Sequence, residues 1–116
     1  MSSNTEGIEV VNVRGLDPQT NGAGIVYVGR RCGKWQNSIL GNPFKIGVHG
    51  TREEVIDKYR DWLKNKLETD QCVQSFIMDL VKRFHNGERL RLGCWCAPLS
   101  CHAEVIKEVV EDTYNF

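Results

Sequence analysis

The chain's 116 residues suffice for one globular domain, and a composition of 41% hydrophobic and 26% charged residues argues against a disordered or fibrous protein. Fifteen basic and fifteen acidic residues cancel to zero formal net charge, which argues against duplex nucleic acid as a partner because proteins that bind its phosphates are usually basic. The sequence shows neither a secretory leader nor an apolar run near the roughly 20 residues that cross a bilayer, so we expect a cytoplasmic protein without a membrane partner.

Two strands are predicted in the first quarter of the chain. Residues 1–7 are small and polar and predict a flexible N-terminus, so that a single domain spans 8–116. Runs of β-branched residues at 8–13 and 25–28 indicate strands, separated by turn-forming Asp-Pro and Asn-Gly pairs. The glycine-rich segment 29–50 has no regular period, and so long a loop in a compact domain is usually functional or disordered. Its apolar residues favour function.

Two amphipathic helices are predicted in the middle of the chain. Thr51 and Glu54 match the pattern of a capping box, and apolar residues recur at helical spacing from Val55 to Leu67. A second helix follows the break at residues 69–70 and ends at the Asn-Gly pair of residues 86–87.

A third strand and a last helix complete the predicted domain. Alternation from Leu90 to Cys96 predicts the strand, on which Cys94 and Cys96 share a face if the strand extends that far. Ser100 or Cys101 can cap a helix. The inward stripe of that helix is Val105, Ile106, Val109, Val110 and Tyr114. The β-β-α-α-β-α order predicts a small α/β domain of two or three layers with a short, mainly parallel sheet.

Reactive side chains concentrate between this strand and this helix. Cys94, Cys96, Cys101 and His102 fall within nine positions, and because cytoplasmic thiols stay reduced, they indicate metal ligands or reactive groups rather than disulfides. Thiolate and imidazole are preferred ligands of zinc, and an iron–sulfur cluster is the alternative. Three ligands with an open position are as consistent with this spacing as a closed site, and Cys32 is a candidate fourth ligand.

Two other interpretations of the cluster need no metal. A helix dipole lowers the pKa of a thiol at the helix N-terminus, so Cys101, assisted by His102, is a candidate nucleophile of a transferase or hydrolase. Alternatively, the cysteines are small buried core residues of a non-catalytic partner-binding or phage accessory module. Cys72 is predicted to be structural. The sequence leaves open whether the chain is an enzyme and what its oligomeric state is.

The segment after the second strand predicts an anion site. Arg30 and Arg31 lie beside glycines and are followed by Ser38 and Asn42, and guanidinium groups bind phosphate or carboxylate oxygens in pairs. Trp95 is a candidate platform for a base. If the second and third strands are parallel neighbours, this segment and the cysteine cluster meet at the carboxyl edge of the sheet. The sequence therefore predicts a Cys/His site beside a loop that binds a nucleotide or another anionic small molecule, with a solvated charged turn as the alternative.

Several motifs of the chain occur in one combination. They are Val10-Val11-Asn12-Val13-Arg14, Tyr27-Val28-Gly29-Arg30, Ser38-Ile39-Leu40-Gly41-Asn42-Pro43-Phe44, Arg52-Glu53-Glu54 with Tyr59 and Trp62-Leu63, and Gly93-Cys94-Trp95-Cys96-Ala97-Pro98 with Cys101-His102. This combination resembles domain of unknown function 4326, a small family of bacteria and bacteriophages, over nearly the whole chain. The resemblance implies a common site around these motifs and brings no settled activity.

Overall fold

The computed structural model describes residues 7–97 and 99–114. Its strands are β1 (Ile8–Asn12), β2 (Val26–Tyr27) and β3 (Leu90–Cys94), and its helices are α1 (Arg52–Thr69), α2 (Gln71–His85) and α3 (His102–Tyr114). The predicted α/β class and β-β-α-α-β-α order are confirmed. The predicted flexible segment 1–7 lies outside the described residues apart from Gly7, and so does the side chain of Tyr114.

The sheet is fully parallel, with β3 between β1 and β2. In its register Ile8 pairs with Leu90, and Val26 pairs with Leu92. A central parallel strand is buried on both faces and is therefore apolar throughout, which fits the burial of β3 at every position except Arg91. Parallel pairing brings all three carboxyl ends to one edge, as the sequence predicted for the second and third strands.

The ends of two strands differ from the sequence prediction. β2 has two residues instead of the four predicted at 25–28, although the backbone N–H of Val28 still donates to a β3 carbonyl at 3.1 Å. β3 ends at Cys94 instead of Cys96. The backbone N–H groups of Cys96 and Ala97 turn back and hydrogen-bond the sulfur of Cys94, so the chain leaves the ladder there.

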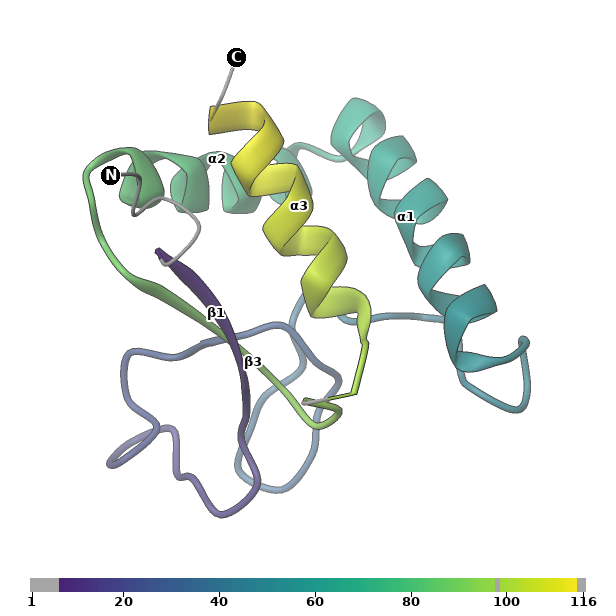
Figure 1. Ribbon diagram of the computed structural model, residues 1–116, viewed down its shortest axis with the longest axis horizontal. Helices are drawn as coiled ribbons and strands as arrows, with labels where there is room; N and C mark the ends of the chain where they lie inside the picture. The colour runs from purple at the N-terminus through teal and green to yellow at the C-terminus, as the bar shows by residue number, and fades with distance from the viewer. Residues whose placement is uncertain (1–6, 98, 115–116) are drawn as a thin grey trace.

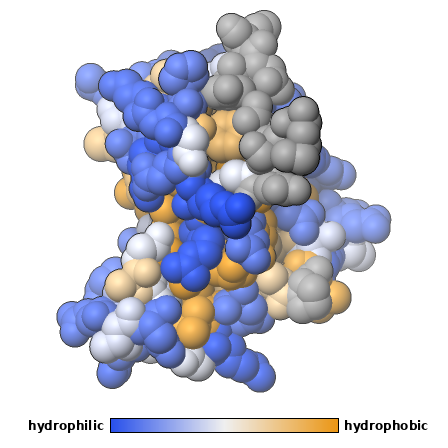
Figure 2. Space-filling model, turned by 60° about the vertical axis from the view of Figure 1, so that its left-hand side comes forward, coloured by the Kyte–Doolittle hydropathy of each residue, from blue (hydrophilic) through white to orange (hydrophobic). Residues whose placement is uncertain are grey.

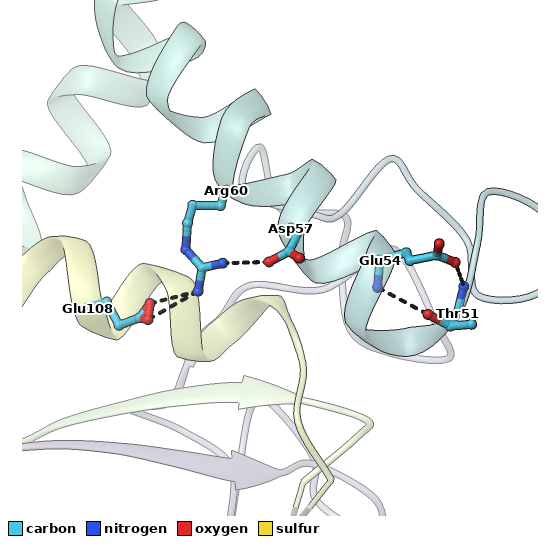
Figure 3. Close-up of polar contacts among 5 residues, drawn as sticks. All are labelled: Thr51, Glu54, Asp57, Arg60 and Glu108. Carbon is cyan, nitrogen blue, oxygen red and sulfur yellow. Dashed lines mark hydrogen bonds and ion pairs between the residues drawn. The ribbon is translucent and has the colours of Figure 1, made fainter.

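The helices begin and end where local side chains satisfy the backbone. The Thr51 hydroxyl accepts from the Glu54 N–H at 3.2 Å, and the Glu54 carboxylate accepts from the Thr51 N–H at 2.8 Å (Figure 3). The capping box is therefore confirmed. Asp70 ends α1 and caps α2, accepting from the N–H groups of Cys72 and Val73. Gly87 has a φ of 82°, the left-handed stop predicted after α2.

One exposed ion pair joins two helices. Arg60 of α1 bonds Asp57 in its own helix and Glu108 of α3 (Figure 3). Such exposed pairs contribute little stability, about 0–1 kcal/mol, so apolar packing holds the helices together. The helix side chains buried most completely in that packing include Leu63, Ile77, Leu80, Ile106 and Val110.

The arrangement of elements defines one edge of the molecule. In Figure 1 the strands run downward, α1 and α3 begin at the lower end, and the segment between residues 13 and 50 winds below the sheet. The carboxyl ends of the strands and the N-termini of α1 and α3 therefore meet there. On the face in Figure 2, hydrophobic surface is visible between hydrophilic side chains. None of the helices within the described ranges is long and apolar enough to cross a bilayer.

Candidate functional site

A cavity of about 540 Å³ opens at the carboxyl edge of the sheet. Its wall comes from the segment after β2, the first turns of α1, and the stretch from Cys94 to His102. Ligands of open α/β sheets bind at this edge, outside the strand ends. The glycine-rich segment and the cysteine cluster thus lie together, as expected from the sequence.

The long segment before α1 is packed and so gives the cavity a fixed wall. Trp35 is buried, and its indole N–H donates to the Leu16 carbonyl at 3.2 Å. Leu40 is fully buried, and its carbonyl accepts from the Tyr59 hydroxyl at 2.7 Å. The amide oxygen of Asn42 accepts from a backbone N–H two residues later at 2.9 Å. These bonds place Asn42 in the cavity wall.

Four cationic side chains line the cavity: Arg30, Arg31, Lys45 and Arg52. In the part of the chain that the structure describes, no carboxylate lies in this wall, and none forms an ion pair with these four. Arg52 is held in place, because its guanidinium donates to the Ser100 carbonyl at 2.9 Å. The cavity therefore has a surplus of positive charge that protein carboxylates do not neutralise.

Three cysteine sulfurs converge at this cavity. Sγ of Cys101 lies 3.2 Å from Sγ of Cys94 and also hydrogen-bonds Cys96. Cys94 and Cys101 are only 2% and 4% exposed, whereas Cys96 is half-buried. All three line the cavity, with Cys96 the most accessible of them.

Hydrogen bonds among the sulfurs decide which one keeps its proton. The bond from Cys101 lowers the pKa of Cys96 to about 5, assisted by the guanidinium groups of Arg52 and Arg30. The same donor, with two backbone N–H groups, lowers the pKa of Cys94 to about 7 despite burial. Donation to both sulfurs and burial raise the pKa of Cys101. The lowered Cys101 pKa expected from its place at a helix start is therefore wrong, because these effects outweigh the helix dipole.

His102 links α3 to the end of β2. Its Nε2 lies 2.5 Å from the Val28 carbonyl oxygen, and because a carbonyl only accepts, Nε2 carries the hydrogen. Burial lowers the pKa of His102, which favours the neutral ring. The ring also meets the Tyr59 ring edge to face, with centroids 4.9 Å apart. A role for His102 as a base for Cys101 or as a metal ligand stays a prediction.

Trp95 is fixed on the cavity wall by two polar neighbours. Its indole N–H donates to the Tyr27 hydroxyl at 2.8 Å, and that hydroxyl donates to the Arg30 carbonyl. The Asn12 amide donates to the carbonyls of Trp95 and Ala97 at 3.2 and 2.8 Å. Trp95 is 39% exposed, so part of its surface remains available to a ligand.

The sequence model of the family described as domain of unknown function DUF4326 matches residues 11–112. The chain belongs to this family. The resemblance drawn from the sequence motifs is thereby confirmed, and the DUF4326 match includes every residue that lines the cavity. No curated protein and no solved structure matches the chain.

Most residues predicted for the site lie together in this DUF4326 domain. The cavity wall includes Arg30, Arg31, Asn42, Trp95, Cys32, Cys94, Cys96, Cys101 and His102. Ser38 is not among the wall residues; its hydroxyl accepts from the Leu40 N–H at 3.1 Å and shapes the turn. Cys72, predicted to be structural, is exposed at the start of α2.

Sequence reasoning assigned no site role to Arg52, Lys45 or Asn12. Arg52 is the first residue of α1, where the helix dipole disfavours a cation. A cation at this unfavourable position could have indicated a functional role for Arg52. Lys45 and Asn12 gave no comparable signal, because only the packed segment and the turn after β3 bring them to the site.

The DUF4326 thiols combine a donor set that suits zinc with a geometry that does not. Thiolates at about 2.3 Å from zinc in a tetrahedron lie about 3.8 Å apart, farther than the 3.2 Å between Cys94 and Cys101. Within the described residues, no three His, Cys, Asp or Glu side chains are placed to hold a metal ion. Zinc would have to move the sulfurs of Cys94 and Cys101 apart.

Proposed function

We propose that this DUF4326 domain binds an anionic, nucleotide-like small molecule in the cavity at the carboxyl edge of its sheet. The observation behind the proposal is the wall of four cations without a carboxylate. Thiolates at Cys94 and Cys96 offset at most two of these charges, so the wall stays positive. Phosphate or carboxylate oxygens would accept charge-assisted hydrogen bonds from the guanidinium groups.

Apolar side chains on the same wall support the nucleotide-like part of the proposal. Phe44, Ile46, Val55, Ile56 and Trp95 line the cavity together with the cations. A nucleobase stacks or packs against an apolar or aromatic surface, whereas inorganic phosphate requires no such surface for binding. The volume of about 540 Å³ falls within the roughly 300–1,000 Å³ of small-molecule sites.

The overall charge limits the class of ligand. Zero net charge gives no long-range attraction to a duplex, so a small anion that enters the cavity is the proposed partner.

The five cysteines are all free. We therefore place the protein in the cytoplasm, where reduction keeps thiols free.

Isothermal titration calorimetry tests this function with three probes. We expect AMP to bind, and to bind more tightly than either adenosine or inorganic phosphate, since each of these lacks one half of the complementary chemistry. Raising the salt concentration from 50 to 200 mM should weaken AMP binding because it screens the cations. If none of the three probes binds, the proposal is wrong, and a non-catalytic partner-binding module becomes the better description.

The first variant to measure is Arg52→Gln, with Lys64→Gln as its matched control. Both remove one cation from α1, but only Arg52 lines the cavity, and Lys64 is exposed on that helix. We expect Arg52→Gln to weaken AMP binding by roughly tenfold, the scale of one lost charge-assisted hydrogen bond. Lys64→Gln should leave it unchanged.

Zinc binding by the three convergent sulfurs is the second candidate function. It is favoured by the donor set, because Cys94, Cys96 and Cys101 line one cavity, and zinc would have to move Cys94 and Cys101 apart. Elemental analysis of the purified protein and titration with cobalt(II), whose thiolate complexes absorb in the near ultraviolet, test it. One equivalent of bound metal that is lost in Cys96→Ser would support the site, and less than about 0.2 equivalents would reject it.

A further inference from the structure

Asn42 and His102 are buried polar residues of the cavity wall, each 9% exposed. The ring hydrogen of His102 is used on the Val28 carbonyl. The Asn42 amide uses its oxygen, which accepts from the Phe44 N–H at 2.9 Å. Its Nδ2 group, with two hydrogens, has no hydrogen-bond partner in the part of the chain that the structure describes.

This Nδ2 group is reached through the cavity. Within the described ranges, the one fully enclosed polar side-chain atom without a partner is Oε2 of Glu111, so Nδ2 of Asn42 is not enclosed. Because nine-tenths of Asn42 is buried and the residue lines the cavity, the cavity is the space that Nδ2 faces. A ligand that displaces water from this space must supply an acceptor, or the donor is left unpaired.

The backbone on both sides of Asn42 is restricted. A Cβ on Gly41 would lie 3.1 Å from the Ser38 carbonyl oxygen and 3.3 Å from that of Gly29, so the chain before Asn42 packs against the start of the segment after β2. Pro43 follows Asn42, and its ring limits the backbone of the residue before it. The donor is therefore held in place before a ligand arrives.

We propose that Asn42 determines ligand specificity by donating a hydrogen bond from Nδ2 to an uncharged acceptor atom of a nucleobase. The ligand class is a nucleotide whose base presents a carbonyl oxygen or a ring nitrogen to this wall. The inference rests on the proposed function, because it adds a contact for the base to the site that binds the anion.

The surroundings of Asn42 favour the base over the phosphate as its partner. Asn42 bonds the backbone of Phe44, and Phe44 and Ile46 supply apolar surface to the same stretch of wall. Lys45 lies between them, but all three arginines of the wall belong to other stretches of the chain. Charge-assisted hydrogen bonds to a phosphate are stronger than those from a neutral amide. The phosphate therefore binds the cations, and the neutral donor remains for the base.

The orientation of the amide makes this contact selective. The Phe44 N–H must face the amide oxygen of Asn42, which fixes Nδ2 at the other position. Nδ2 has hydrogens and no acceptor, so a base amino group placed there would leave two donors facing each other. Sites that hydrogen-bond a ligand discriminate strongly against molecules that lack the matching atom.

Calorimetric titration of the intact protein with AMP and ribose 5-phosphate isolates the contact with the base, since the two molecules share sugar and phosphate. Asn42→Asp keeps an oxygen for the Phe44 N–H and has no N–H donor. Its added charge weakens binding of both anions, whereas the lost donor affects AMP alone. We expect the ratio of the two dissociation constants to change against AMP by about tenfold.

Asn37→Asp is the matched control. Asn37 is exposed on the same segment and lies outside the cavity wall, so this variant adds the same charge and should leave the ratio unchanged. Asn42→Ser removes the amide without adding charge and should weaken AMP binding but not ribose 5-phosphate binding. Thermal melting shows whether each variant is folded. An unchanged ratio in folded Asn42→Asp would overturn the inference.

Nuclear magnetic resonance of the wild-type protein gives a direct readout that does not depend on the fold of a variant. The Nδ2 hydrogens of Asn42 are assigned from the side-chain amide signals of an isotope-labelled sample. We expect AMP to shift one of these signals downfield, as formation of a hydrogen bond does, and ribose 5-phosphate to leave it in place. Equal shifts with both ligands would assign the donor to the phosphate and would contradict the inference.

Failure of this inference and failure of the proposed function give different results. If AMP binds the Asn42 variants as tightly as the wild type, the specificity residue is wrong and the binding site stands. If the wild type binds ribose 5-phosphate as tightly as AMP, the anion site stands, but the nucleobase contact is wrong. If neither molecule binds, the proposed function is wrong, and the role of Asn42 is rejected with it.

Discussion

Buried polar side chains attach the cavity wall to the core. His102 of α3 donates to the Val28 carbonyl, and Tyr59 of α1 donates to the Leu40 carbonyl. Removing such a donor leaves a buried carbonyl without a partner, which costs about 1–3 kcal/mol. The two residues therefore fix the ends of the segment that carries Arg30 and Arg31.

The neutral state of His102 predicts a pH dependence of stability. Burial lowers the pKa of His102 in the folded protein. In the unfolded chain a histidine has a pKa of about 6.5, so the unfolded chain takes up the proton at a higher pH than the folded protein does. The stability that the neutral ring supplies is present above that value and is lost as the pH falls through the folded pKa. We expect the free energy of unfolding, measured in urea, to decrease between pH 7 and pH 5.

The matched variant is His102→Gln, which keeps an N–H donor at the ε position and does not titrate. Its stability should depend less steeply on pH over the same interval. Equal slopes in the two proteins would show that carboxylates elsewhere cause the dependence.

At the scale of elements, α1 and α2 share one residue at their junction. Asp70 lies between the last turn of α1 and the first turn of α2, and its carboxylate accepts from the N–H groups of Cys72 and Val73 at 2.9 and 3.3 Å. The first turn of α2 contains no acidic residue, so Asp70 supplies the negative charge that its N-terminus prefers.

Asp70→Ala should therefore lower the free energy of unfolding by about 1 kcal/mol, the usual value of a lost N-cap. Asp70→Asn keeps an oxygen acceptor and should cost less. Urea denaturation of the three proteins measures both differences, and equal losses in Ala and Asn would mean that charge, rather than the cap hydrogen bond, stabilises this junction.

At the scale of the whole molecule, close approach at β3 determines how the sheet meets the segments around it. A Cβ on Gly93 would lie 2.6 Å from Cγ2 of Ile25 and 2.7 Å from Cγ1 of Val13. These two side chains come from the segments that precede β2 and follow β1. Only glycine lets both of them cover the central strand directly before the cysteine cluster.

Gly93→Ala should destabilise the protein by about 1–3 kcal/mol, the usual cost of overpacking. Combining it with Val13→Ala removes one of the two overlaps. The double variant should then lose less stability than the sum of the single variants, and a strictly additive loss in thermal or urea unfolding would show that the two side chains do not meet.

Much of the fold was predictable from the sequence because its signals are local. The capping box of Thr51 and Glu54, the left-handed stop at Gly87 and the apolar spacing of the helices each depend on residues within a few positions. The end of β3 was not predictable, since the amides of Cys96 and Ala97 bond a sulfur instead of a strand. Strand β2 is likewise shorter than predicted, because only Val26 and Tyr27 pair with residues of β3.

The sequence alone determined the order of the elements, the family, and the proximity of Cys94, Cys96, Cys101 and His102 along the chain. Periodicity, caps and motif spacing depend on residues that are close together along the chain, and so they can be recognised in the sequence alone. Tertiary structure alone decided that Arg52 lowers the pKa of Cys96, that the pKa of Cys101 is raised, and that His102 donates to the Val28 carbonyl. Protonation and exposure depend on which distant segments meet, and the parallel sheet brings those segments to one edge.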